Sequence, residues 1–256
     1  MSSEASAVRG AEAGDDPIIS VRDLHKWYSG VHALQGIDLD IQRGESLGLI
    51  GDNGAGKSTL INILSGVYPP SSGTIVFDGR PVRIRSPKEA TRLGIETIYQ
   101  YNSVVPSMSI ARNLFISREP LRWSIGGFGL IDTKRMHAEA TRALSDVGLH
   151  LRSPDAVVSE LSGGQRQGVA IARAMHFKSK VLILDEPTNH LSVKETNKVI
   201  SFVRGLKSQG VTGIFISHNI QHVMQSCDRV VAMARGKIVA DCRVADVTMD
   251  ELVSHL

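Results

Sequence analysis

The sequence GDNGAGKST, at residues 51–59, decides the fold of this chain. It follows the apolar residues 46–50 and precedes the helix-like residues 60–64. The pattern G-x-x-x-x-G-K-[ST] predicts a loop whose backbone N–H groups surround phosphate oxygens at a helix start. The loop consists of Gly51, Asp52, Asn53, Gly54, Ala55, Gly56, Lys57, Ser58 and Thr59. We expect Lys57 to reach the β- and γ-phosphates and Ser58 to offer its hydroxyl to Mg²⁺. The loop alone does not separate kinases, GTPases, motors and transporters.

Composition limits the class of protein. With 256 residues, 42% hydrophobic and 21% charged, the chain is long enough for one large domain or one and a half. The net charge of +3 is too small to imply a nucleic-acid partner. No apolar run approaches the length of about 18 residues that a membrane-spanning helix needs. Residues 1–17 lack the basic segment and the apolar segment of a signal peptide, so we expect a cytosolic chain. The spacing of Cys227 and Cys242 indicates free thiols.

The order of elements predicts an α/β fold. Residues 1–17 are small, polar and acidic, which is typical of a disordered tail. Apolar alternation in residues 18–41 predicts antiparallel strands joined by a turn at 29–30, and residues 74–77 form another hairpin-type strand. Residues 108–148 are helical in pattern, with a loose break at 126–129. Buried strands at 181–184 and 213–216, separated by a helix starting near Ser192, predict a mostly parallel sheet.

A second motif, LSGGQ at residues 161–165, begins another helix. A serine cap and two glycines there would present bare N–H groups and a positive helix dipole to phosphate, although a plain helix cap after a loop is the alternative. Together with the loop at 51–59 and VLILDE at 181–186, this segment resembles the ATP-binding cassette (ABC) ATPases, in which L-S-G-G-Q is the signature motif. The resemblance implies a head-to-tail dimer in which the signature of one subunit covers the ATP held by the other. The implied nucleotide contacts of the signature are Ser162, Gly163, Gly164 and Gln165.

The resemblance runs from residue 18 to about 246 and implies a P-loop NTPase with a mostly parallel sheet. An N-terminal antiparallel β subdomain and an inserted α-helical subdomain complete that fold class. We expect an ABC ATPase domain at 18–250, with the helical subdomain at about 102–165 and a C-terminal end at 251–256. Residues 189–192 place Ser192 where the family usually has aspartate. The resemblance therefore does not establish how tightly the two ATP sites communicate across the dimer.

The candidate catalytic and metal residues follow buried strands. Asp185 and Glu186 end an aliphatic strand, so their carboxylates are expected at the sheet edge beside the phosphate loop, where a helix cap is the competing role. Asp185 would hold Mg²⁺, and Glu186 resembles the catalytic glutamate that orients the attacking water. His218 also follows a strand and resembles the switch histidine that contacts the γ-phosphate.

Two further residues have roles that only the resemblance implies. Gln100 resembles the Q-loop glutamine, which contacts Mg²⁺ and water and links the site to the helical subdomain. Tyr28 resembles the aromatic residue that stacks on adenine, although Trp27 could do so instead and either could be core.

Residues 65–73, 78–79, 86–87 and 94–100 resemble the simple-sugar importer branch. The implied function is ATP-driven uptake of a small solute, with ATP and Mg²⁺ as cofactors. A monosaccharide is the solute that the resemblance favours. The implied partners are a second ATPase subunit, transmembrane permease subunits and, indirectly, an extracytoplasmic solute-binding protein. The chain would then be peripheral on the cytoplasmic side of the cell membrane. An exporter subunit and a nucleotide-dependent switch on ribosomes or DNA remain alternatives.

Overall fold

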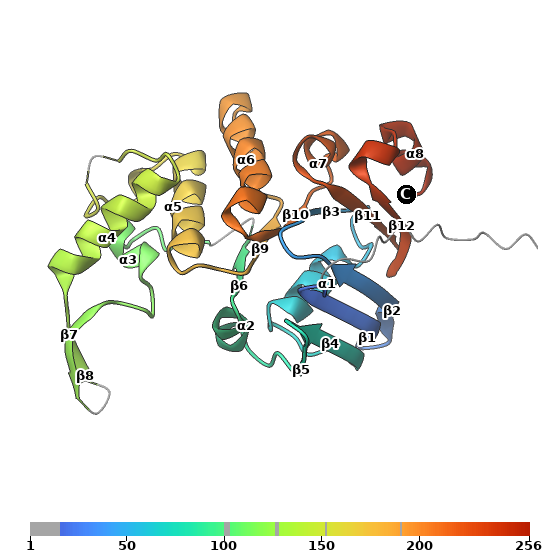
Figure 1. The fold of residues 1–256 in the computed structure, drawn as a ribbon, viewed down its shortest axis with the longest axis horizontal. Helices are drawn as coiled ribbons and strands as arrows, with labels where there is room; N and C mark the ends of the chain where they lie inside the picture. Colours follow the sequence, from blue (N-terminus) through green and yellow to red (C-terminus); the bar gives the residue numbers. More distant parts are fainter. Residues whose placement is uncertain (1–15, 100–102, 126–127, 152, 190) are drawn as a thin grey trace, which may run out of the picture.

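A mostly parallel sheet of six strands forms the centre of the molecule (Figure 1). The structure is a computed structural model that describes residues 16–99, 103–125, 128–151, 153–189 and 191–256. The strands of the sheet are β3 (Ser46–Ile50), β6 (Ile95–Ile98), β9 (Val181–Asp185), β10 (Thr212–Ile216), β11 (Arg229–Ala234) and β12 (Lys237–Arg243). They lie in the order β12-β11-β3-β10-β9-β6, and only the edge strand β12 runs antiparallel to its neighbour in the described chain. The predicted α/β class is confirmed.

The central strands are buried on both faces, which explains their uninterrupted aliphatic sequences. Along β9, Val181 and Ile183 join one core while Leu182 and Leu184 join the other. The helices are α1 (Lys57–Leu64), α2 (Pro87–Leu93), α3 (Ile110–Leu114), α4 (Thr133–Asp146), α5 (Gly163–His176), α6 (Val193–Leu206), α7 (Ile220–Ser226) and α8 (Met249–Ser254). Short 3₁₀ turns occupy Val158–Glu160, Lys207–Gln209 and Val244–Asp246. Within the described chain, no helix combines the length and the apolar character needed to cross a bilayer.

An antiparallel sheet packs with α1 against one face of the central sheet (Figure 1). Its strands are β1 (Ile19–Tyr28), β2 (Val31–Ile41), β4 (Ser72–Phe77) and β5 (Arg80–Val82), in the order β2-β1-β4-β5. The turn between β1 and β2 lies at Ser29 and Gly30, both with positive φ, as a tight hairpin requires. The antiparallel strands and the turn predicted from residues 18–41 are therefore confirmed. The opposite face of the central sheet packs against α6, α7, α8 and part of α5.

A third core lies between α3, α4 and α5 at one end of the molecule (Figure 1). It lies within the stretch where a helical subdomain was expected, and it extends into α5 through Val169 and Ala172. The helical pattern expected for residues 108–148 is wrong on both sides of the break, because β7 (Leu121–Ile125) and β8 (Phe128–Ile131) pair as an antiparallel hairpin. Residues 126 and 127 of the expected break lie outside the described residues. Apolar residues at every second position of β7 favour a strand over a helix there.

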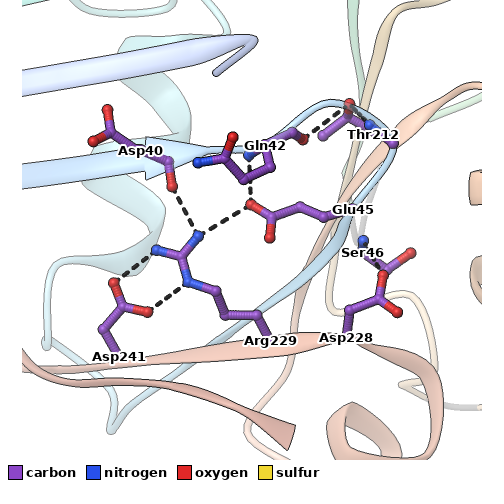
Figure 2. A network of polar contacts seen from close by, with 9 residues as sticks. Asp40, Gln42, Glu45, Ser46, Thr212, Asp228, Arg229 and Asp241 are labelled. Carbon is purple, nitrogen blue, oxygen red and sulfur yellow. Dashed lines mark hydrogen bonds and ion pairs between the residues drawn. The ribbon is translucent and has the colours of Figure 1, made fainter. Parts of the chain in front are cut away.

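Arg229 connects the antiparallel sheet to the central sheet (Figure 2). Its guanidinium donates to the backbone carbonyl of Asp40 in β2 at 2.9 Å, to Glu45 Oε1 at 3.1 Å, and to both carboxylate oxygens of Asp241 in β12. Burial raises the pKa of the Glu45 carboxyl, while the Gln42 N–H and the Arg229 charge act in the opposite direction. The hydrogen bond to β2 and the ion pairs with Glu45 and Asp241 together fix the relative position of β2, β11 and β12.

Candidate functional site

The loop that follows β3 has a backbone that requires glycine at two positions. Gly51 has φ +148°, and a Cβ there would lie 2.3 Å from the carbonyl oxygen of Met233. Gly56, the N-cap of α1, has φ +106°, and a Cβ there would lie 2.9 Å from the carbonyl oxygen of Ala33. Only glycine adopts these conformations without strain and with this close backbone approach. The predicted loop therefore leads directly into the N-terminus of α1.

Lys57 is the first residue of α1 and is buried, at 7% exposure. Its Nζ donates to the carbonyl oxygens of Gly51 and Asp52, the latter at 3.0 Å. Burial lowers the pKa of the Lys57 ammonium, opposed by the nearby carboxylates, of which Glu186 has the largest effect. The lysine thus holds the loop in its curved shape and places a positive charge inside it.

The carboxyl ends of three adjacent strands bring the other predicted residues to this loop. Ile216 in β10 pairs with Leu49 in β3 on one side and with Asp185 in β9 on the other. Residues after these strands therefore gather at one edge of the sheet. A cavity of about 490 Å³ lies there. The site residues predicted from the sequence that line this cavity are Gly51, Asp52, Asn53, Lys57, Ser58, Asp185, Glu186 and His218. Sequence reasoning missed Asn189, Ile220 and Leu256, which also line it.

Glu186 has a left-handed backbone, with φ +49°, directly after β9. Its N–H donates to the carbonyl oxygen of Ile216 at 3.0 Å, which holds the residue against β10. Its Oε1 accepts from the backbone N–H of His218, and its Oε2 lies 3.0 Å from His218 Nδ1. A non-glycine residue in this conformation is uncommon and often marks a functional position. The carboxylate is thereby fixed at the edge of the cavity.

Asp185 and Ser58 supply the oxygen atoms that a Mg²⁺ ion would need. Burial raises the pKa of the Asp185 carboxyl, Glu186 raises it further, and Lys57 opposes both. Among the residues the structure describes, no cluster of three or more His, Cys, Asp or Glu side chains could hold a metal by itself. Mg²⁺ in nucleotide sites takes one or two protein oxygens and completes its shell with phosphates and water. The two residues therefore fit Mg²⁺ in company with a nucleotide, whose phosphates the adjacent loop could bind.

The LSGGQ residues begin α5 and do not line this cavity. Ser162 is the N-cap: its hydroxyl accepts from the N–H of Gln165, and its own N–H donates to Gln165 Oε1. Gly163 and Gly164 form the first helical positions, where backbone N–H groups lack intrahelical partners. The predicted helix start is confirmed, and within one chain the starts of α1 and α5 do not meet in one cavity.

The remaining predicted residues lie away from the cavity or outside the described chain. Tyr28 packs edge-on against Tyr68, with ring centroids 5.8 Å apart, and the Lys26 ammonium lies 5.0 Å from the Tyr28 ring centroid. Trp27 stacks on His32 and is half exposed. Neither aromatic ring lines the cavity. Gln100 lies outside the described residues.

Comparisons with known proteins agree on one family. The sequence profile described as "ABC transporter" matches residues 34–189. The chain is 40% identical to the xylose/arabinose import ATP-binding protein XylG of Sulfolobus acidocaldarius, over 92% of each chain. It is 42% identical to the fructose import ATP-binding protein FrcA of Rhizobium meliloti, over 94% of each chain. Among solved structures, an ATP-binding cassette of an ABC transporter in its ADP conformation superposes with a TM-score of 0.78, at 25% identity over 94% of both chains.

Proposed function

Since the chain belongs to the ABC transporter family of ATPases, we propose that it hydrolyses ATP to drive uptake of a monosaccharide through separate transmembrane subunits. The observation that carries the ATPase part is the meeting of Lys57, Glu186 and His218 at one cavity. One relative is named as a xylose/arabinose import protein and the other as a fructose import protein, and these names support a sugar as the solute. They also favour import over export or a ribosomal or DNA switch.

Nucleotide binding would begin at the loop. The free N–H groups at the start of α1 and the dipole of that helix favour the β- and γ-phosphates, and Lys57 adds a full positive charge. Ser58 and Asp185, together with Gln100, are the residues that would hold Mg²⁺. When bound, the ion would neutralise negative charge on the phosphate oxygens. Tyr28 is the proposed adenine contact, which would extend the site beyond the cavity.

Hydrolysis would depend on the Glu186 carboxylate. Two contacts from His218 hold this carboxylate at the cavity edge, and the Glu186 backbone N–H bonds to the carbonyl oxygen of Ile216. A carboxylate held in this way can accept a hydrogen bond from water and align that water with a γ-phosphate in the loop. The His218 side chain beside it is exposed, so its ring can also contact the γ-phosphate. Both residues would then act at the phosphate end of the nucleotide.

The position of the LSGGQ residues implies a second subunit. Because Ser162, Gly163, Gly164 and Gln165 lie outside the cavity, they can complete an ATP site only on another chain. A head-to-tail dimer would place the signature of each subunit over the ATP of the other. We propose that this dimer lies on the cytoplasmic side of the cell membrane against permease subunits. An extracytoplasmic solute-binding protein would deliver the sugar to those permease subunits.

Affinity purification from detergent-solubilised membranes tests the transport part of this proposal. The chain would be expressed in its native host with a tag, in its native form and as Glu186→Gln, to separate partner binding from turnover. We expect both forms to recover the same integral membrane protein, whose loss should abolish uptake of radiolabelled monosaccharide. Recovery of ribosomal proteins or DNA without an integral membrane protein would overturn the importer assignment.

A further inference from the structure

The signature of this chain already holds a carboxylate from the same chain. Glu195 lies in the first turn of α6, and its Oε1 accepts from the Ser162 hydroxyl at 3.0 Å and from the Gly164 N–H at 3.2 Å. Its Oε2 accepts from the N–H and the hydroxyl of Ser192, the N-cap of α6. One side chain therefore bonds to the starts of two helices, α5 and α6.

The missing side chain of Gly164 makes room for this carboxylate. A Cβ at Gly164 would lie 2.6 Å from Glu195 Oε1 and 2.7 Å from its Cγ and Cδ. The carboxylate thus occupies the space directly over the backbone of the signature glycine. An anion that approached these N–H and hydroxyl groups from outside would need the same space.

The Ser162 hydroxyl and the Gly164 N–H each have a single hydrogen, so neither can donate at full strength to two anions. Hydrogen bonds from Ser192, Ser162 and Gly164 hold the pKa of the Glu195 carboxyl below its usual range, so the side chain is charged at neutral pH. A phosphate brought to the same donors would meet a negative charge at contact distance, which is repulsive. Binding of Glu195 and binding of phosphate at this place are therefore mutually exclusive.

We propose that Glu195 is a positioning residue that occupies the phosphate-facing donors of the signature in the separated subunit and must release them before the dimer closes on ATP. The inference rests on the proposed function, in which those donors bind the ATP of a second subunit. The helix that carries Glu195 follows the loop after Glu186, so the catalytic end of β9 and the signature contact are joined by one short segment.

ATP-dependent dimerisation of the Glu186→Gln chain tests this inference. This variant slows hydrolysis, so that sedimentation velocity can report the dimer fraction at each ATP concentration. Adding Glu195→Gln keeps the length and an acceptor oxygen for the cap of α6 but removes the charge. Because the neutral amide oxygen accepts more weakly than the carboxylate and does not repel phosphate, the ATP concentration for half-maximal dimerisation should fall roughly five-fold. Adding Glu195→Asp instead, which shortens the side chain away from Gly164, should shift it in the same direction.

Glu251 offers a matched control. It caps α8 through the N–H and hydroxyl of Thr248, as Glu195 caps α6, and has no bond to the signature. Adding Glu251→Gln to the Glu186→Gln chain should leave the half-maximal ATP concentration unchanged. If Glu195→Gln leaves that concentration unchanged or raises it, the inference is overturned while the proposed function stands. If the parental Glu186→Gln chain forms no ATP-dependent dimer, the proposed dimeric function fails, and the inference with it.

Discussion

His218 contacts the Glu186 carboxylate twice, through its backbone N–H at Oε1 and its ring Nδ1 at Oε2, each at 3.0 Å. The two residues follow adjacent parallel strands, β9 and β10, so the sheet register sets their distance. The backbone contact survives any substitution of the His218 side chain, and the ring contact does not. The pair therefore allows the ring's contribution to be separated from the position of the strand.

Replacing His218 with alanine should lower ATP turnover about 10- to 100-fold and leave ATP binding nearly unchanged. The Glu186 carboxylate would keep its backbone hydrogen bond but lose the ring contact that fixes its second oxygen. Steady-state ATPase kinetics and a fluorescent-nucleotide titration measure the two quantities. His137→Ala, on α4 away from the cavity, is the control. A His218→Ala chain with native turnover would show that the ring takes no part in hydrolysis.

Replacing Lys57 with alanine should weaken ATP binding by about 100-fold or more. The substitution removes the positive charge inside the loop and the two hydrogen bonds that hold its curve. Equilibrium dialysis with labelled ATP measures the loss. Lys88→Ala on the exposed side of α2 should bind like the native chain. Equal affinity of the two variants would remove Lys57 from the nucleotide site.

Much of the fold could be predicted because its signals are local. The helix start near Ser192 and the hairpin turn at Ser29 and Gly30 depend on residues close together in the chain. The aliphatic runs of β9 and β10 likewise indicate strands buried on both faces. The meeting of Lys57, Glu186 and His218 then follows from parallel strands ending at one edge.

The missed features depend on tertiary placement. The bond between Glu195 and Ser162 forms because α5 and α6 start side by side, which neither segment encodes alone. Asn189 and Leu256 line the cavity without a motif that marks them. The β7–β8 hairpin was missed because apolar alternation over a few residues competes weakly with the helical pattern on both sides.

Replacing Arg229 with methionine should lower the free energy of unfolding by about 3 kcal/mol. The guanidinium side chain is 18% exposed and pairs with Glu45 and Asp241, so its loss leaves the Glu45 carboxylate buried without its charge partner. Urea denaturation followed by circular dichroism measures the change. Arg22→Met breaks an exposed pair with Asp40 and should cost less than about 1 kcal/mol. Equal losses in the two variants would contradict a stabilising role for the network in Figure 2.

Cys227 should resist alkylation in the folded protein. Burial raises the pKa of its thiol to about 12, so almost no thiolate exists at pH 8. Burial also raises the pKa of the Cys242 thiol, but this side chain is only partly covered. Iodoacetamide followed by mass spectrometry should therefore label Cys242 first and Cys227 only as the protein unfolds. Labelling of both thiols at the same rate in the native state would contradict the burial of Cys227.

The ATPase rate of Glu186→Gln tests the central claim most directly. The substitution keeps the shape of the side chain and an oxygen for the His218 N–H, and it removes the charge that would polarise the attacking water. We expect turnover to fall about 100-fold or more with ATP binding retained, and Glu251→Gln to hydrolyse ATP at the native rate. Near-native turnover in Glu186→Gln would contradict the assignment of this cavity as the site of ATP hydrolysis.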